Sequence, residues 1–119
     1  MISGCTASGN TGSGVAVISK CAVTGCTIVA NNTANTTFAA GMFVFGDGCR
    51  IDGNYFASNN YAGLVTETGV SKTFIVRNIF HGAQFILRTP AGNVFGPFED
   101  HTATGGQIAT NSPFANMGD

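Results

Sequence analysis

A block of two short apolar segments recurs along this chain, and it is clearest at residues 41–56, GMFVFGDGCRIDGNYF. Its second segment follows the pattern apolar, x, Gly, Asn, x, apolar, and equivalent segments begin at Ile2, Val23, Ile51 and Ile75. These starting points lie 21, 28 and 24 residues apart. A repeat of this length is typical of solenoids, in which successive repeats stack and bury one continuous core.

A second set of apolar segments falls between the members of the first, and its members start at Gly14, Gly41, Gly63 and Ala83. All of these segments are short and end at Gly, Asn, Asp or Ser, which is typical of strands and excludes long amphipathic helices. The sequence also lacks the regular Leu and Asn framework of leucine-rich repeats. Because the strands are constant and the loops between them vary, we predict an all-β, right-handed parallel β-helix of about four coils.

The repeat also divides the chain, which we expect to be a single domain. Residues 1–98 are expected to form the coils, and residues 99–119 a tail that caps the open C-terminal end with Phe114 and Met117 as apolar anchors. Ile2 already occupies a strand position. We therefore expect the chain to be either a fragment of a longer polypeptide or part of an assembly in which another polypeptide covers this end.

The blocks that end in Gly-Asn and an apolar pair resemble the coils of the pectate-lyase-like β-helix superfamily, which includes phage tailspike proteins. The resemblance covers roughly residues 2–95. It implies a ladder of stacked inward side chains at the turns, in which each Asn amide bonds to the backbone of the next coil. The residues predicted for this ladder are Cys5, Cys26, Asn54, Asn78 and Asn93.

The four cysteines occupy aligned positions, with Cys5 above Cys26 and Cys21 above Cys49. A small buried Cys can fill a ladder position as a packing residue. A separation of one coil also lies within the range of a disulfide, which is the alternative to the free stacked thiols that we expect.

The second strand set is apolar on both of its faces, which normally means that both faces are covered. We place Val15, Met42 and Leu64 in the core, and an apolar stripe on the outside. Such a stripe is larger than a soluble monomer usually exposes, so we predict a subunit interface, and the resemblance to tail proteins implies a homotrimer. The alternative is that the chain's own tail covers it. The residues of the stripe are Phe43, Phe45, Val65, Phe85 and Leu87.

Charged residues make up only 9% of the chain and the net charge is −1, so the chain has no basic patch that would bind nucleic acid. No apolar run is long enough to cross a membrane. We also expect no metal and no cofactor, because the sequence has no Cys-x-x-Cys motif and its two His residues lie far apart.

Candidate chemical groups are few. Asp52, Glu67 and Arg77 could form a small acid–base site if loops brought them together. The interpretation that we favour is that these residues are scattered, solvated charges. Tyr55 and Tyr61 combine an apolar ring with a polar tip and are candidates for glycan contact. Asn31 and Asn35 match the glycosylation acceptor pattern, although a polar surface loop is the interpretation that we favour for that segment.

Three functions are compatible with these features. The first is a non-enzymatic structural or receptor-facing part of a phage tail or similar surface assembly, located on a virion or outside the cell and in contact with cell-surface polysaccharide. The second is a polysaccharide lyase or hydrolase, supported only by analogy of fold. The third is a monomeric glycan-binding or ice-binding module. We expect the first.

Overall fold

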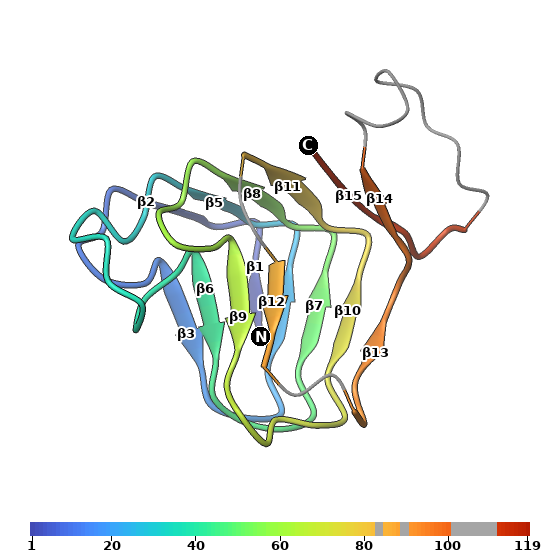
Figure 1. The fold of residues 1–119 in the computed structure, drawn as a ribbon. Coiled ribbons are helices and arrows are strands. Elements are labelled where there is room, and N and C mark those ends of the chain that lie inside the picture. The colour runs from blue at the N-terminus through green and yellow to red at the C-terminus, as the bar shows by residue number, and fades with distance from the viewer. Residues whose placement is uncertain (83–84, 89–90, 101–111) are drawn as a thin grey trace.

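The computed structural model describes residues 1–82, 85–88, 91–100 and 112–119. These residues form fifteen short strands and no helix, and all the strand pairings are parallel. Each of the first four turns of the chain contributes one strand to each of three sheets, so the molecule is a β-solenoid of about four turns (Figure 1). The predicted fold class is thus confirmed.

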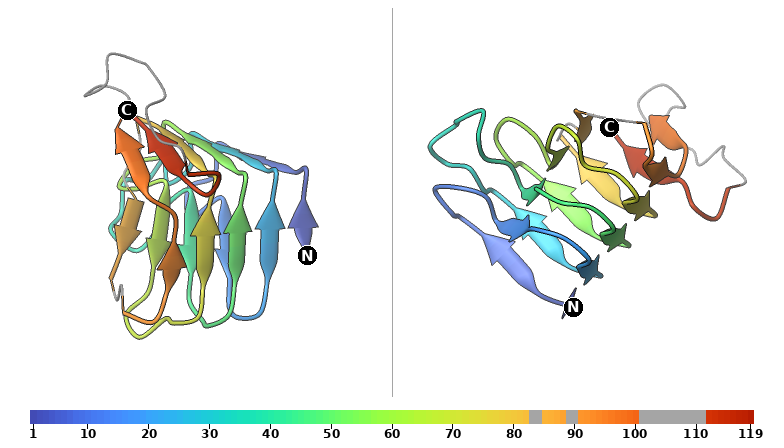
Figure 2. Two further views of the ribbon diagram at one scale, coloured as in Figure 1. Left: turned by 90° about the vertical axis from the view of Figure 1, so that its right-hand side faces the viewer. Right: turned by 90° about the horizontal axis from the view of Figure 1, so that it is seen from below.

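The sheets are named here A, B and C. Sheet A consists of β1 (Ile2–Ser3), β4 (Ala22–Thr24), β7 (Arg50–Asp52), β10 (Phe74–Val76) and β13 (Val94–Phe95). Sheet B consists of β2 (Thr6–Ser8), β5 (Thr27–Val29), β8 (Tyr55–Ala57), β11 (Ile79–His81), β15 (Asn116–Gly118) and β14 (Phe98–Asp100). Sheet C consists of β3 (Val15–Val17), β6 (Met42–Val44), β9 (Leu64–Thr66) and β12 (Phe85–Leu87). Figure 2 shows the strands of each sheet stacked side by side along the solenoid.

Residues with left-handed backbone conformation produce the corners between the sheets. At the corner from sheet A to sheet B this residue is Gly4, Gly25 and Gly53 in the first three turns, with φ of 60°, 60° and 65°. Glycine adopts this conformation without a steric penalty. The other two corners repeat the arrangement, with Gly9, Ala30, Ser58 and Gly82 between sheets B and C, and with Lys20, Gly48, Lys72 and Gly92 between sheets C and A.

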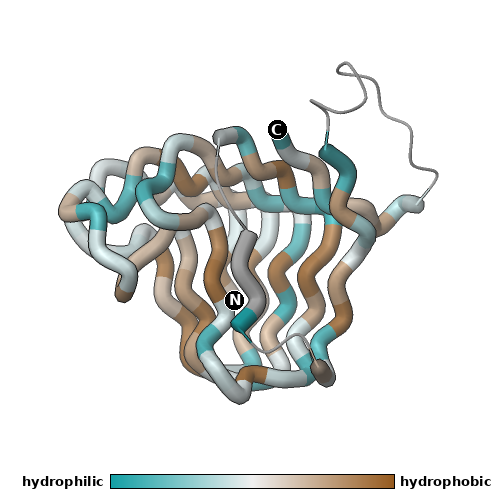
Figure 3. Tube along the Cα trace, viewed as in Figure 1, coloured by the Kyte–Doolittle hydropathy of each residue, from teal (hydrophilic) through white to brown (hydrophobic). Residues whose placement is uncertain are grey.

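Short strands with alternating side chains enclose the core. Along sheet A, Val23, Ile51 and Ile75 are paired in register and completely buried. In sheet B the rings of Phe56 and Phe80 stack with their centroids 4.8 Å apart. The tube in Figure 3 shows polar and apolar residues alternating along β7, as expected for a strand with one face inward, whereas β10 is apolar throughout.

The outer face of sheet C differs from the prediction of an exposed apolar stripe. Phe43 and Val65 are 1% and 0% exposed, because Ala40 and Ala62 from neighbouring loops pack against them within the same chain. Phe45 stacks on Phe43 at 4.6 Å and is itself 50% exposed. The prediction was therefore wrong for Phe43 and Val65, which no partner subunit can reach.

The fourth coil of sheet C is also shifted by one residue from the predicted alignment. Phe85 pairs with Leu64 and Leu87 pairs with Thr66, so the register places Ile86, rather than Phe85, in the row of Val65. Gly14, Gly41 and Gly63 stand directly before the three earlier strands, whereas Gln84 stands directly before β12, so the sequence had no marker for the register of this strand.

The end of the chain joins sheet B in an order that the sequence did not suggest. β15 pairs with β11 on one side and with β14 on the other, although β14 precedes it in sequence. The two strands lengthen sheet B, and residues 101–111 between them lie outside the described residues. The capping role assigned to residues 99–119 stays a prediction.

Candidate functional site

A cluster of two arginines and one aspartate lies on the outer face of sheet A. Arg50 and Asp52 are alternate residues of β7 and therefore point to the same side, while Ile51 between them points into the core. Val76 of β10 pairs with Asp52, so Arg77, the next residue, is brought beside the carboxylate. Turn geometry and parallel register thus assemble the cluster from two successive coils.

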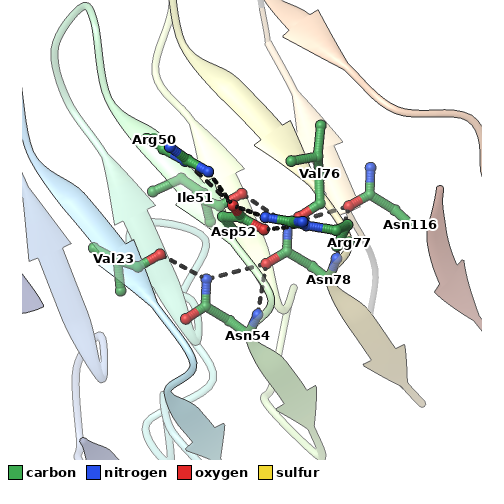
Figure 4. A network of polar contacts seen from close by, with 9 residues as sticks. All are labelled: Val23, Arg50, Ile51, Asp52, Asn54, Val76, Arg77, Asn78 and Asn116. Carbon is green, nitrogen blue, oxygen red and sulfur yellow. Dashed lines mark hydrogen bonds and ion pairs between the residues drawn. The ribbon is translucent and has the colours of Figure 1, made fainter. Parts of the chain in front are cut away.

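Both guanidinium groups donate to the same carboxylate (Figure 4). Nε of Arg77 donates to Oδ1 of Asp52 at 2.7 Å, and its Nη2 donates to Oδ2. Nη2 of Arg50 also donates to Oδ2, at 2.7 Å, with its Nε at 3.2 Å. The Asp52 side chain is 5% exposed, whereas those of Arg50 and Arg77 are 60% and 50% exposed.

The arginines determine the protonation state of the cluster. The hydrogen bond from Arg77, supplemented by that from Arg50, lowers the pKa of Asp52 although burial acts in the opposite direction. Asp52 is therefore ionised at neutral pH and its oxygens already accept four hydrogen bonds. A carboxylate in this state is a poor general base and cannot donate a proton as an acid.

Arg77 has an unusual backbone conformation for its residue type. Its φ is 58°, at the corner position that is glycine in the three preceding turns. A side chain in this region costs about 1 kcal/mol or more. Unlike the glycines at this corner, Arg77 has a side chain that pairs with Asp52.

Glu67, the third residue of the predicted acid–base set, lies elsewhere. It follows β9 of sheet C, where Nη1 of Arg88 donates to its Oε1 at 3.0 Å. The backbone N–H of Thr68 is the main cause of its lowered pKa, and Arg88 adds to the effect. The guanidinium of Arg88 also lies over the ring of Phe43, 5.4 Å from its centroid. The structure thus brings Asp52 and Arg77 together but separates both from Glu67.

The ladder predicted at the corner between sheets A and B includes a residue that the sequence did not indicate. Oδ1 of Asn54 accepts from the backbone of Cys26, and Oδ1 of Asn78 accepts from the backbone and the amide of Asn54. The next member is Asn116 of β15, whose Oδ1 accepts two hydrogen bonds from Asn78. Cys5 lies at the open end of the same column, since its carbonyl accepts from Thr27 next to Cys26.

Asn93 belongs to a different corner, and its inclusion in that ladder was wrong. Its Oδ1 accepts from the backbone N–H of Thr73, and Oγ1 of Thr73 accepts from Cys49. It therefore continues the column of Cys21 and Cys49 between sheets C and A. Asn93 was assigned to the wrong ladder because the pair Gly92-Asn93 resembles Gly53-Asn54 in sequence. In the structure, however, Gly92-Asn93 precedes a strand of sheet A. All four cysteines are free thiols in the structure, and burial raises the pKa of Cys49.

A third ladder occupies the corner between sheets B and C. Asn59 accepts from the backbone and the amide of Asn31, and Asn31 in turn accepts from Asn10. Asn31 and Asn32 are completely buried, so the surface-loop and glycosylation interpretations of Asn31 were wrong. The spacing of 28 residues between Asn31 and Asn59 equals that between Cys26 and Asn54, and this was the sequence signal for the third ladder.

The two tyrosines considered for glycan contact lie on different faces. Tyr55 is 39% exposed on β8 of sheet B, whereas Tyr61 packs against the small apolar cluster that covers sheet C. Tyr61 also has a φ of 66°. The two rings therefore do not form a common surface.

Two negative findings apply to the described part of the chain. There, His, Cys, Asp and Glu do not come together in any group of three or more that could hold a metal ion. The same residues contain no helix of the length and apolarity that a membrane span requires.

Comparisons with protein-family models, curated proteins and solved structures gave no match for this chain. The class that the geometry defines is a parallel β-solenoid with three internal ladders.

Proposed function

We propose that the chain is a non-enzymatic structural or receptor-facing segment of a phage tail or similar surface assembly, located on a virion or outside the cell. The observation that carries this proposal is the ladder from Cys26 through Asn54 and Asn78 to Asn116, which links successive turns by buried hydrogen bonds. A stack held in this way resists bending and displacement of one turn against the next. Such rigidity suits a part that transmits load or displays a surface.

The state of the acidic residues supports a role without catalysis. Asp52 is saturated by two arginines, and Glu67 is held by Arg88 and the backbone N–H of Thr68. Glycoside hydrolases need two carboxyl groups across one bond, one of them protonated. Asp52 and Glu67 lie on different sheets and have lowered pKa values, which is the opposite of that requirement.

The subunit contact of such an assembly is proposed for the outer face of sheet B. The row from Thr6 to Met117 has no charged side chain, and Tyr55 and Ile79 in it are paired in register and 39% and 42% exposed. Charged groups border it, since Glu99 of β14 continues the row beyond Met117 and His81 pairs with Asp119 at the end of β11. A face with an uncharged centre can meet copies of itself around a symmetry axis. A homotrimer is the arrangement that we propose. The row consists of Thr6, Thr27, Tyr55, Ile79 and Met117.

Light scattering on a size-exclusion column across a dilution series tests the assembly. We expect a trimer that Ile79→Asp converts to a monomer, while Phe74→Asp on sheet A leaves it intact. A monomer at every concentration would contradict the proposed assembly. In parallel, release of new sugar ends from a panel of polysaccharides tests for catalysis: an activity that Asp52→Asn abolishes would establish the enzyme alternative.

A further inference from the structure

The four cysteines lie at two of the three corners, and all of them belong to the first turn (residues 2–21) or the second turn (residues 22–49). Cys5 and Cys26 are successive members of the column between sheets A and B. Cys21 and Cys49 are successive members of the column between sheets C and A. Cysteine therefore occurs where the first turn meets the second. In the later turns the first column continues with Asn54, Asn78 and Asn116, and the second with Thr73 and Asn93.

A thiol does not replace the amide that links the turns elsewhere. Nδ2 of Asn54 donates to Oδ1 of Asn78 at 3.0 Å. At the third corner, Nδ2 of Asn10 in the first turn donates to Oδ1 of Asn31 in the second turn at 2.8 Å. A thiol is only a weak donor and a weak acceptor. At two of their three corners, the first and second turns therefore meet through thiols in place of amides.

The first turn is also less buried than the second. Among the described residues, β1, β2 and β3 each have a neighbouring strand on one side only. Ile2 and Val15 are partly buried, whereas their partners in register, Val23 and Met42, are completely buried. Segments with fewer buried apolar contacts open more readily than the rest of a molecule. A covalent link at these corners would therefore strengthen a turn that packing alone holds less firmly.

The backbone places the members of each pair one strand spacing apart. The N–H of the residue after Cys26 donates to the carbonyl of Cys5 at 2.9 Å. In the same way, the N–H of the residue after Cys49 donates to the carbonyl of Cys21 at 2.8 Å. This spacing, about 4.8 Å, falls within the range of Cα separations in disulfides, about 4.4–6.8 Å. The sulfur of Cys26 is directed toward the first turn, since it lies 3.9 Å from the carbonyl oxygen of Ile2.

Each pair combines an accessible thiol with a buried one. Cys5 is exposed and Cys21 is partly exposed, whereas Cys26 and Cys49 are 2% and 1% exposed. Burial raises the pKa of Cys49, which lowers the fraction of this residue that is present as the reactive thiolate. The accessible cysteine of each pair is therefore the one that an oxidant in solution reaches first.

We propose that Cys5 with Cys26, and Cys21 with Cys49, are redox-sensitive pairs that oxidise to disulfides and tie the first turn to the second. The proposal rests on the location outside the cell given under the proposed function, since a reducing cytosol keeps thiols free. The oxidant is a small disulfide such as oxidised glutathione.

The oxidation of each pair proceeds in two exchange steps. The thiolate of the accessible cysteine attacks one sulfur of the glutathione disulfide, and a glutathione thiolate leaves. The thiolate of the buried cysteine then attacks the protein sulfur of this mixed disulfide, and a second glutathione thiolate leaves. Each pair loses two electrons and two protons, which end on the two glutathione thiols.

Oxidation of the full chain with glutathione disulfide under native conditions tests the pairing, which mass spectrometry after blocking of free thiols and digestion identifies. Four cysteines allow three pairings, and we expect only Cys5–Cys26 together with Cys21–Cys49. The mass of the chain should fall by about 4 Da, two hydrogens for each bridge. The chain oxidised in urea is the matched control without native register, and it should give a mixture of the three pairings.

Hydrogen exchange measures whether the bridges hold the first turn. Oxidation should slow amide exchange of residues 2–24 about tenfold or more, whereas residues 74–76 in sheet A should change less than about twofold. Cys5→Ser should keep the bridge from Cys21 to Cys49 and lose the slowing at residues 2–8. Cys21→Ser should keep the other bridge and lose the slowing at residues 15–24.

Three results would each overturn the proposal: thiols that stay free in glutathione disulfide, a native pairing other than the expected one, and exchange in the first turn that oxidation leaves unchanged. Light scattering of the same samples reports the trimer separately. A chain that forms both bridges but stays monomeric would support the redox pairs and contradict the assembly, so the two failures are distinguishable.

Discussion

At position 66 the inward column of sheet C changes from valine to threonine. Val17, Val44 and Thr66 are paired in register, and Thr66 is completely buried. Its hydroxyl is the one buried side-chain polar atom without a hydrogen-bond partner among the described residues. A buried hydroxyl in that state destabilises the folded chain.

We expect Thr66→Val to raise the free energy of unfolding by about 1 kcal/mol, because it removes an unsatisfied group and keeps the shape of the side chain. Urea denaturation measures the change. Thr73→Val is the control, since Oγ1 of Thr73 accepts from Cys49 and donates to the carbonyl of Ser71. That variant should be destabilised, and a similar response at both positions would contradict the explanation.

The left-handed conformation of Arg77 leads to a second prediction for a single residue. Arg77→Gly and Arg77→Ala both lose the ion pair with Asp52, but only glycine accepts φ of 58° without strain. The glycine variant should therefore be more stable than the alanine variant by about 1 kcal/mol. At Arg50, which lies within β7, the order should reverse because glycine weakens a strand. Thermal unfolding of the Gly and Ala variants at Arg77 and at Arg50 measures the order of stability at each position.

At the scale of the strands and corners, the ladders contribute buried hydrogen bonds that no single strand provides. Asn78 connects three turns, since it accepts from Asn54, donates to the carbonyl of Ile51 and donates to Asn116. Removal of its amide leaves several buried groups without partners. The ladder is therefore a cooperative element rather than a set of independent contacts.

We expect Asn78→Ala to lower the free energy of unfolding by about 3 kcal/mol, because each unsatisfied buried group costs about 1–3 kcal/mol. Asn10→Ala is the comparison at the exposed end of another ladder and should cost less than about 1 kcal/mol. Chemical denaturation monitored by circular dichroism gives both values. Equal losses would mean that burial of the ladder amide has little effect.

Sequence and structure agree best where the pattern is local and repeated. The starts at Ile2, Val23, Ile51 and Ile75 are indeed paired in register, because alternation and turn residues determine that alignment. The burial of Phe43 was missed, since it depends on how variable loops fold back over sheet C. Asn116 was missed because its strand joins β11 across 38 residues, a distance at which no repeat marks the partner.

For the whole molecule, stability should depend on pH through the arginine cluster. The pKa of Asp52 is lower in the folded chain than its unfolded value of about 3.9, so folding favours the ionised form. This contribution is fully present above the unfolded pKa and is lost as the pH falls below it and through the lower folded pKa. Asp119 and Glu67 have lowered pKa values and act in the same direction.

The Asp52→Asn variant isolates the contribution of this residue to the acid sensitivity. It should be less stable than the wild-type chain at neutral pH, and the difference should shrink as the pH falls. Urea midpoints measured across the acid range give the stability of the wild-type chain and of the variant as a function of pH. Parallel curves for the two proteins would show that Asp52 does not titrate on unfolding.

The three columns of corner residues also define how the length of this molecule can change. Removal of residues 26–53 would place Gly25 directly before Asn54, so a left-handed glycine would again precede a ladder residue. Loss of a single residue within a strand would instead shift the rest of that strand out of register with its neighbours in the sheet. Whole turns can therefore be gained or lost by duplication or deletion of the corresponding part of the gene. A shortened chain without residues 26–53 should still unfold cooperatively, which calorimetry measures.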